Sequence, residues 1–209
     1  MKQDKNLDIK HKLLEVALDI ASEQGWSSLS LSDIAQRAEL DLETIYRISD
    51  KDGLLDCLES WADLAMSALP LSSEARDKDR LFDTIMRRFE YFETRRSGVI
   101  ALMKARRKSP RRMARLVRAR SISADWILIC TGLDQGPRLE QKLRKASLIW
   151  ILARTERAWR ADIHGDFAKT MSVLDQSLTQ SEDRLAKLSQ KCRKTPNISE
   201  PIAAEQTSP

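Results

Sequence analysis

Apolar residues recur every three or four positions along most of this chain, which is the spacing of an amphipathic helix. The first such stripe consists of Ile9, Leu13, Val16, Ala17, Ile20 and Ala21. It stops at Gly25, a residue type that commonly closes a helix. Another stripe begins at Leu54 and runs to Pro70, which cannot continue a helix. The pattern predicts an all-α fold.

Residues 30–52 have the pattern of two short helices joined by a tight turn. Ser30 stands at an N-cap position with Asp33 as its capping-box partner, and Asp41 offers a second N-cap. The inward faces consist of Ile34, Ala35, Ala38, Leu42, Ile45 and Tyr46. Two helices of this length around a short turn form a helix-turn-helix, whose second helix lies in the DNA major groove. A simple helical corner of an all-α domain would give the same pattern.

The second half of the chain predicts further helices. Ser109 and Pro110 form a helix start, and another helix is expected from Arg138 to about Asp162. The last helix has a seven-residue pattern of Phe167, Met171, Leu174, Leu178, Ser181, Leu185 and Leu188. Such a seam packs along another helix, in the same chain or in a second copy. Residues 71–79 are polar and predict a hinge, and residues 192–209 have little to bury and predict a disordered tail.

Charge is distributed unevenly. Residues 1–60 contain 7 Lys/Arg and 13 Asp/Glu, a net of −6, whereas residues 61–209 contain 29 and 18, a net of +11. Residues 104–120 hold nine Lys/Arg and no acid. Three interpretations of this segment stay open: a solvated helix face, a docking patch for an acidic protein or an anionic membrane, and an auxiliary nucleic-acid contact.

Composition argues against several classes of protein. The three cysteines have no CxxC spacing, and the two histidines have no metal-ligand spacing around them. P-loop, GxSxG and GxGxxG motifs do not occur. The charged N-terminus is not a secretory signal, and the apolar runs are too short to span a bilayer. We therefore expect a cytoplasmic protein that is not an enzyme and has no metal or cofactor.

The run from residue 8 to residue 60 resembles the N-terminal domain of TetR-family transcriptional regulators. The matching features are the Ala17/Ala21 helix, Gly25, Ser30, Asp33-Ile34-Ala35, Ala38, Ile45-Tyr46 and Lys51–Leu54. The resemblance implies a helix-turn-helix domain with a linking helix over 1–69, a helical ligand-binding and dimerisation domain over 75–191, and a homodimer through residues 138–188. It implies contacts to double-stranded DNA from Ser30, Arg37, Leu42, Thr44, Tyr46, Arg47 and Lys51.

Three features depart from the family pattern. Glu39 stands where the turn between the two helices usually has Gly. The segment between Tyr46 and Lys51 is one residue short and lacks the usual aromatic. Residues 39–52 hold five acids against Arg47 and Lys51, a net of −3, which is a poor electrostatic footprint for DNA.

The second half also resembles a narrower branch, that of the lipid-binding ubiquinone-biosynthesis protein of TetR-like fold. The correspondences are Phe82, Met86, Phe89, Gly98, Trp126, Trp159, Asp162, Met171, Leu174 and Asp175. An apolar or lipid ligand is expected near Phe89, Phe92, Trp126, Trp150 and Trp159. The favoured interpretation is a TetR-type regulator with an apolar effector. The alternative is a lipid- or isoprenoid-quinone-binding accessory protein that has lost DNA binding.

Overall fold

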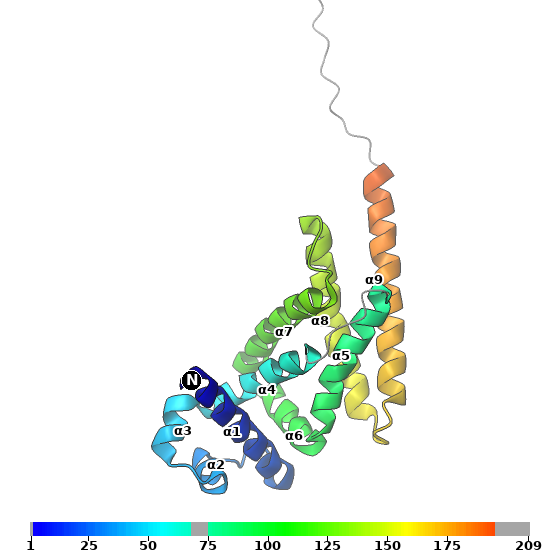
Figure 1. The fold of residues 1–209 in the computed structure, drawn as a ribbon. Coiled ribbons are helices and arrows are strands. Elements are labelled where there is room, and N and C mark those ends of the chain that lie inside the picture. Colours follow the sequence, from blue (N-terminus) through cyan, green and yellow to red (C-terminus); the bar gives the residue numbers. More distant parts are fainter. Residues whose placement is uncertain (1, 68–74, 195–209) are drawn as a thin grey trace, which may run out of the picture.

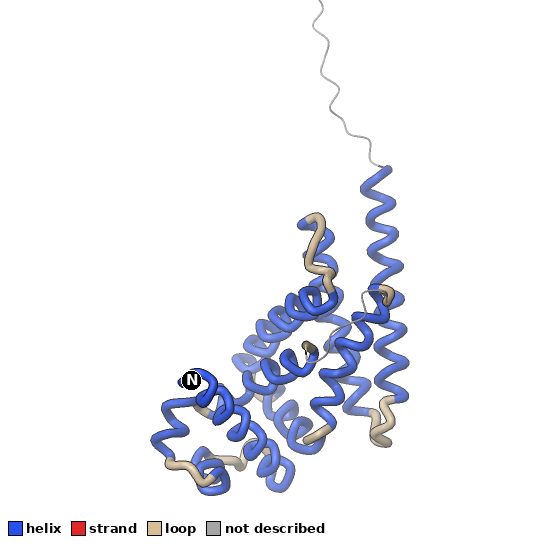
Figure 2. Tube along the Cα trace, viewed as in Figure 1, coloured by secondary structure: helices blue, strands red, loops and turns tan. Residues whose placement is uncertain are grey.

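The computed structural model describes residues 2–67 and 75–194, with side chains over 6–67 and 75–187. All secondary structure in these residues is helical, so the predicted all-α class is confirmed (Figures 1 and 2). The helices are α1 (Lys2–Gln24), α2 (Leu31–Ala38), α3 (Leu42–Ile48), α4 (Lys51–Met66), α5 (Asp77–Glu93), α6 (Arg96–Arg107), α7 (Pro110–Thr131), α8 (Arg138–Ala161) and α9 (Ala168–Lys194).

Helix ends follow the local sequence signals. The Ser109 side chain accepts from the Arg112 amide at the start of α7, with Pro110 in the first turn. Gly25 follows α1 with a φ of 83°, a left-handed conformation that glycine adopts without steric cost. Helix α9 runs to Lys194, so the tail predicted from residue 192 begins inside a helix, and residues 195–209 lie outside the described part. Part of the predicted hinge, 71–74, also lies outside it.

Helices α1–α3 gather at one end of the molecule, while α5–α9 form a larger body (Figure 1). Helix α4 joins the two by packing on α1, α5 and α7, and α1 packs along α6. One buried core runs from Leu13 in α1 to Leu178 in α9. The division into domains at residues 69 and 75 stays a prediction, because α4 contributes to both sides.

Helices α1 and α6 approach each other at backbone distance. A Cβ built on Gly98 of α6 would lie 2.2 Å from the carbonyl oxygen of Leu18 in α1. Only glycine allows this approach, because any side chain would meet backbone atoms. The end that carries α2 and α3 is therefore packed firmly against the larger body.

The seven-residue seam of α9 packs within the chain over its middle part. Leu174 and Leu178 are fully buried where α9 lies against α5 and α8, whereas Met171 is 42% exposed. The seam alone is therefore not evidence for a second copy, because the chain's own helices cover its central leucines.

Candidate nucleic-acid interface

The capping predicted for α2 is present. The Ser30 hydroxyl oxygen accepts from the Asp33 amide at 3.1 Å, and the Asp33 carboxylate accepts from the Ser30 amide at 2.8 Å. These hydrogen bonds lower the pKa of Asp33. Glu39 then ends α2 in the left-handed region, with φ 55° and ψ 44°. A residue with a side chain thus makes the turn that directs α3 away from α2.

Helix α3 has one anchored side and one open side. Asp41 caps it by accepting from the amide and hydroxyl of Thr44, both at 2.6 Å. Ile45 is fully buried, while Leu42 is 49% and Tyr46 is 77% exposed. A short helix held by a buried isoleucine and exposing a tyrosine has the form of a recognition helix.

The cations of this region are engaged inside the chain. The two terminal nitrogens of the Arg37 guanidinium group donate to the Glu23 carboxylate, at 2.6 and 3.0 Å. Arg47 pairs with Glu43 on the exposed side of α3. The Lys51 ammonium donates to the carbonyl of Leu29 and, at 3.4 Å, to that of Ser27. Burial and the neighbouring Arg112 lower the pKa of Lys51.

The seven predicted DNA contacts thus have different surroundings. Ser30 and Thr44 bond to the aspartates at the starts of α2 and α3. Arg37 bonds to Glu23 of α1, and Lys51 bonds to the loop before α2. Leu42, Tyr46 and Arg47 form the outward face of α3. Sequence patterns did not indicate that Lys51 connects the start of α4 to residues 27–29, because the two segments are more than twenty residues apart.

Three of the five aromatic residues expected around a ligand lie in the closed core. Phe89, Phe92 and Trp159 have neighbouring ring centroids 5.7–6.4 Å apart, and each side chain is at most 1% exposed. The Trp159 indole donates to Glu93 at 2.7 Å, and the Arg96 guanidinium stacks on its ring at 4.7 Å. This cluster fills its own space and leaves no room for a ligand among the rings.

The other two aromatic residues lie apart from that cluster. The Trp126 indole donates to the Asp63 carbonyl at 2.9 Å, which ties α7 to α4. Trp150 is 42% exposed on α8, with the guanidinium groups of Arg154 and Arg184 over its ring at 5.1 and 5.5 Å. The structure does not bring the five aromatic residues together.

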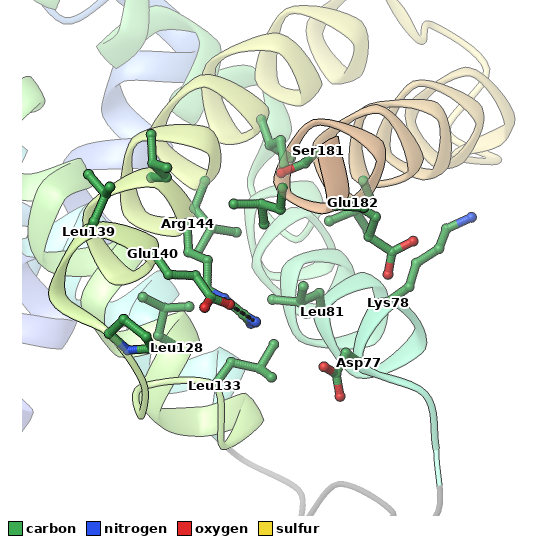
Figure 3. A pocket seen from close by; sticks show the side chains of 17 residues that line it. Asp77, Lys78, Leu81, Leu128, Leu133, Leu139, Glu140, Arg144, Ser181 and Glu182 are labelled. Atoms are coloured by element: carbon green, nitrogen blue, oxygen red, sulfur yellow. Dashed lines mark hydrogen bonds and ion pairs between the residues drawn. The ribbon is translucent and has the colours of Figure 1, made fainter. Parts of the chain in front are cut away.

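A cavity of about 560 Å³ lies elsewhere, between α5, the α7–α8 loop, α8 and α9 (Figure 3). None of the five aromatic residues lines it. Its walls are mainly aliphatic, made by Leu81, Leu128, Leu133, Leu139, Leu143, Leu148, Ile151, Leu178 and Leu185. At its edge Arg144 bonds to Glu140 at 2.6 Å and Lys78 to Asp175 at 2.7 Å, and Glu182 also lines it. The cavity suits an uncharged apolar molecule of ordinary ligand size.

A buried ionic cluster connects α4 to the larger body. Glu59 of α4 is paired with both Arg88 of α5 and Arg106 of α6, and Arg88 also bonds to Asp63 at 2.7 Å. Burial alone would raise the pKa of Glu59, but the two guanidinium groups hold it at about 2. Arg106 also donates to the carbonyl of Leu55. Movement of α5 or α6 must therefore displace α4, because separating these charges in the interior is costly.

Other kinds of site find no support in the described residues. No group of three or more His, Cys, Asp or Glu side chains there could hold a metal ion. No helix in the same residues is both long enough and apolar enough to cross a membrane.

Solved structures of TetR regulators superpose on this arrangement of helices. No protein-family profile and no curated protein matches the sequence. A TetR transcriptional regulator from Nitrosomonas europaea ATCC 19718 superposes with a TM-score of 0.69 at 20% identity, over 83% of this chain and 98% of that one. The fold is TetR-like. A TetR regulator from Rhodococcus sp. RHA1 gives 0.62 at 15% identity, over 86% and 98%. A TetR-family regulator from Streptomyces coelicolor gives 0.58 at 17%, over 88% and 82%.

At these identities the likeness establishes the fold alone. In a TetR-like fold, the capped helices α2 and α3 form the helix-turn-helix, and α5–α9 form the body that contains the cavity. The predicted fold class is therefore confirmed.

Proposed function

We propose that this protein is a TetR-type transcriptional regulator that binds operator DNA as a homodimer through α3. The observation that carries the proposal is the outward face of α3, where Tyr46 is 77% and Leu42 is 49% exposed while Ile45 anchors the helix. A tyrosine hydroxyl can bond to a base edge or a phosphate, and leucine can contact a thymine methyl group.

Arg47 adds a cation that can change partner. Its ion pair with Glu43 is exposed on both sides, with side chains 75% and 72% accessible. Exposed pairs of this kind contribute little to stability, so a phosphate can replace the carboxylate. Thr44, Tyr46 and Arg47 would then contact the DNA, while Ser30 and Lys51 fix the two helix starts beside its backbone.

The test is selection of bound sequences from a random duplex library by the purified protein at 0.15 M salt. We expect enrichment of a palindromic site, and at least a tenfold loss of affinity for it in Tyr46→Ala, since one base contact provides about 1–3 kcal/mol. Asp83→Ala, at an exposed position of α5, is the control, since it lies outside the helix-turn-helix and outside α8 and α9. If no duplex is enriched, even at 0.05 M salt, the proposal is wrong.

A homodimer would join through the outer face of α8 and the neighbouring surface of α9. One stripe of α8 is exposed throughout, formed by Lys142, Ala146, Trp150, Ala153 and Arg157. Tryptophan is enriched in the centre of interfaces, and Trp150 is a large, partly exposed one in the middle of this stripe. Two copies would place their α3 helices about 34 Å apart, one turn of B-DNA. Ala153→Glu should give a monomer in analytical ultracentrifugation, whereas Lys169→Glu on the first turn of α9 should not.

The effector would occupy the cavity between α5, α8 and α9. Since its walls are mainly aliphatic and both cations at its edge are already paired, we propose an uncharged apolar compound that shifts the population between two positions of the DNA-binding ends. Titration with N-phenyl-1-naphthylamine tests the site. Leu143→Trp, which fills the cavity, should weaken its binding at least tenfold, and Leu64→Trp on the exposed side of α4 should not.

A second candidate function is favoured by the same cavity together with the internal pairing of Arg37 and Lys51. It is that of an accessory protein that carries a lipid or isoprenoid quinone and has lost DNA binding. Native mass spectrometry would then detect co-purifying lipid, displaced in Leu143→Trp, and the library selection would enrich nothing. The basic residues 104–120 would in that case contact an anionic membrane or an acidic protein.

A further inference from the structure

The basic segment 104–120 separates into two groups in the structure. Four of its nine cations are held by carboxylates: Arg106 by Glu59, Arg112 by Asp52, Arg115 by Asp56, and Arg120 by Glu156. The other five are exposed and have no carboxylate partner among the described residues: Lys104, Arg107, Lys108, Arg111 and Arg118. Four of these five surround the junction where α6 ends and α7 begins. We call Lys104, Arg107, Lys108 and Arg111 the α6–α7 corner.

The corner lies beside the helix-turn-helix. Lys104 and Lys108 line one side of a hollow whose other side is the end of α1 and residues 25–27. Arg112, which directly follows Arg111, bonds to Asp52 in the first turn of α4 at 3.0 Å. Lys51, at the start of α4, donates to Ser27 in the same loop. The corner therefore borders both the loop that leads into α2 and the first turn of α4.

The arginines of α7 that form ion pairs also offset the negative charge of the neighbouring helix α4. Arg112 and Arg115 neutralise Asp52 and Asp56, the acids on the first turns of α4. The exposed side chains of the α6–α7 corner are all basic, whereas the helix-turn-helix carries a net charge of −3 over residues 39–52. The cations that α2 and α3 lack are thus supplied from the other half of the sequence.

We propose that the α6–α7 corner binds the phosphate backbone of the same duplex that α3 contacts. The inference rests on the proposed function and assigns a role to residues outside the helix-turn-helix. Affinity for DNA depends heavily on cations that displace counterions from phosphates. The corner provides this sequence-independent attraction, while the outward face of α3 provides the sequence-dependent contacts.

The salt dependence of binding measures this contribution. Each phosphate contact contributes about 0.9 to the slope of log K against log salt concentration. A dimer that loses three contacts on each protomer should therefore lose up to about 5 from that slope. At 0.15 M salt we expect the dissociation constant to rise at least about tenfold.

The experiment uses the full chain and a mixed-sequence duplex of about 30 base pairs, titrated at several salt concentrations from 0.05 to 0.2 M. The test variant is Lys104→Gln/Lys108→Gln/Arg111→Gln. The control, Arg76→Gln/Arg118→Gln/Lys169→Gln, removes the same charge from exposed positions away from the corner. All changes are at exposed side chains, so both variants should keep the parent's helical content and melting temperature.

A lower slope in the test variant, with the control close to the parent, supports the proposal. Equal slopes in the two variants overturn it and leave the proposed function standing, provided that the parent binds and Tyr46→Ala still weakens binding to the selected site. A parent that binds no duplex at 0.05 M salt overturns both. Loss of binding by the test variant to vesicles containing phosphatidylserine, with unchanged binding to the duplex, also overturns the proposal and assigns the corner to a membrane surface.

Discussion

Replacing Gly98 by alanine tests how firmly the end that carries α2 and α3 is joined to the body. The new Cβ would lie 2.2 Å from the carbonyl oxygen of Leu18, 2.7 Å from its carbonyl carbon and 2.9 Å from its Cα. Ordinary contacts begin at 3.4 Å, so α1 and α6 must separate by about 1.2 Å, the difference from 2.2 Å. These are backbone atoms of a helix, which cannot rotate out of the way.

The expected cost follows from two opposing effects. Overpacking of this kind costs up to about 3 kcal/mol, and alanine in place of glycine within a helix returns about 1 kcal/mol. We expect a net loss of about 2 kcal/mol in the free energy of unfolding. With a urea m-value of about 2 kcal/mol per molar, the midpoint of unfolding falls by about 1 M.

Gly53→Ala is the matched control, since Gly53 also lies in a helix. There the Cβ would meet side-chain atoms, the Ser49 hydroxyl at 2.5 Å and the Asp50 carboxylate at 2.9 Å, and both can move. The weakened cap and the gain in helix propensity are each about 1 kcal/mol, so stability should change little. Urea unfolding followed by circular dichroism measures both variants. If Gly98→Ala is as stable as Gly53→Ala, the backbone contact between α1 and α6 is wrong.

Two further predictions concern the turn and the ionic cluster. Glu39→Gly relieves a left-handed conformation that costs about 1–2 kcal/mol but makes the unfolded chain more flexible, so the melting temperature should rise slightly. The control Gln36→Gly, within α2, should lower the melting temperature. A lower melting temperature in Glu39→Gly would contradict the turn geometry. The pKa of Glu59 is lowered from 4.5 to about 2, so its contribution to stability is complete above pH 4.5 and is lost as the pH falls toward 2. The Glu59→Gln variant should be about 3–5 kcal/mol less stable than the parent at pH 7, and its free energy of unfolding should change less with pH in this window. Urea titrations at each pH measure both effects. An equal pH dependence of stability in the two proteins would be evidence against the paired carboxylate.

The features that could be predicted from sequence are those decided by neighbouring residues. Ser30 with Asp33, Asp41 with Thr44, and Ser109 with Pro110 are local hydrogen-bonding or conformational signals, and each lies where a helix begins. Glu39 stands where the family that the sequence resembles usually has Gly, and it takes the left-handed conformation that glycine adopts without steric cost.

The partners of long side chains could not be predicted in this way. Helical spacing indicates which face of α7 is polar, but it does not indicate that Arg112 meets Asp52, sixty residues away. The cavity lies away from the aromatic residues for a related reason. Phe89 and Trp159 have the spacing of a buried stripe, and in the structure they pack on each other, while aliphatic residues such as Leu81 surround the cavity.

The cluster around Glu59 restricts how this chain can be recombined with others. An engineer who builds a chimaera by exchanging residues 1–67 for the equivalent segment of another TetR-like protein would remove Glu59 and Asp63 and keep Arg88 and Arg106. Two guanidinium groups would then face the new junction in the interior without a counter-charge. A hybrid that folds must therefore carry both acids at positions 59 and 63, or have both arginines replaced by apolar residues at the same time.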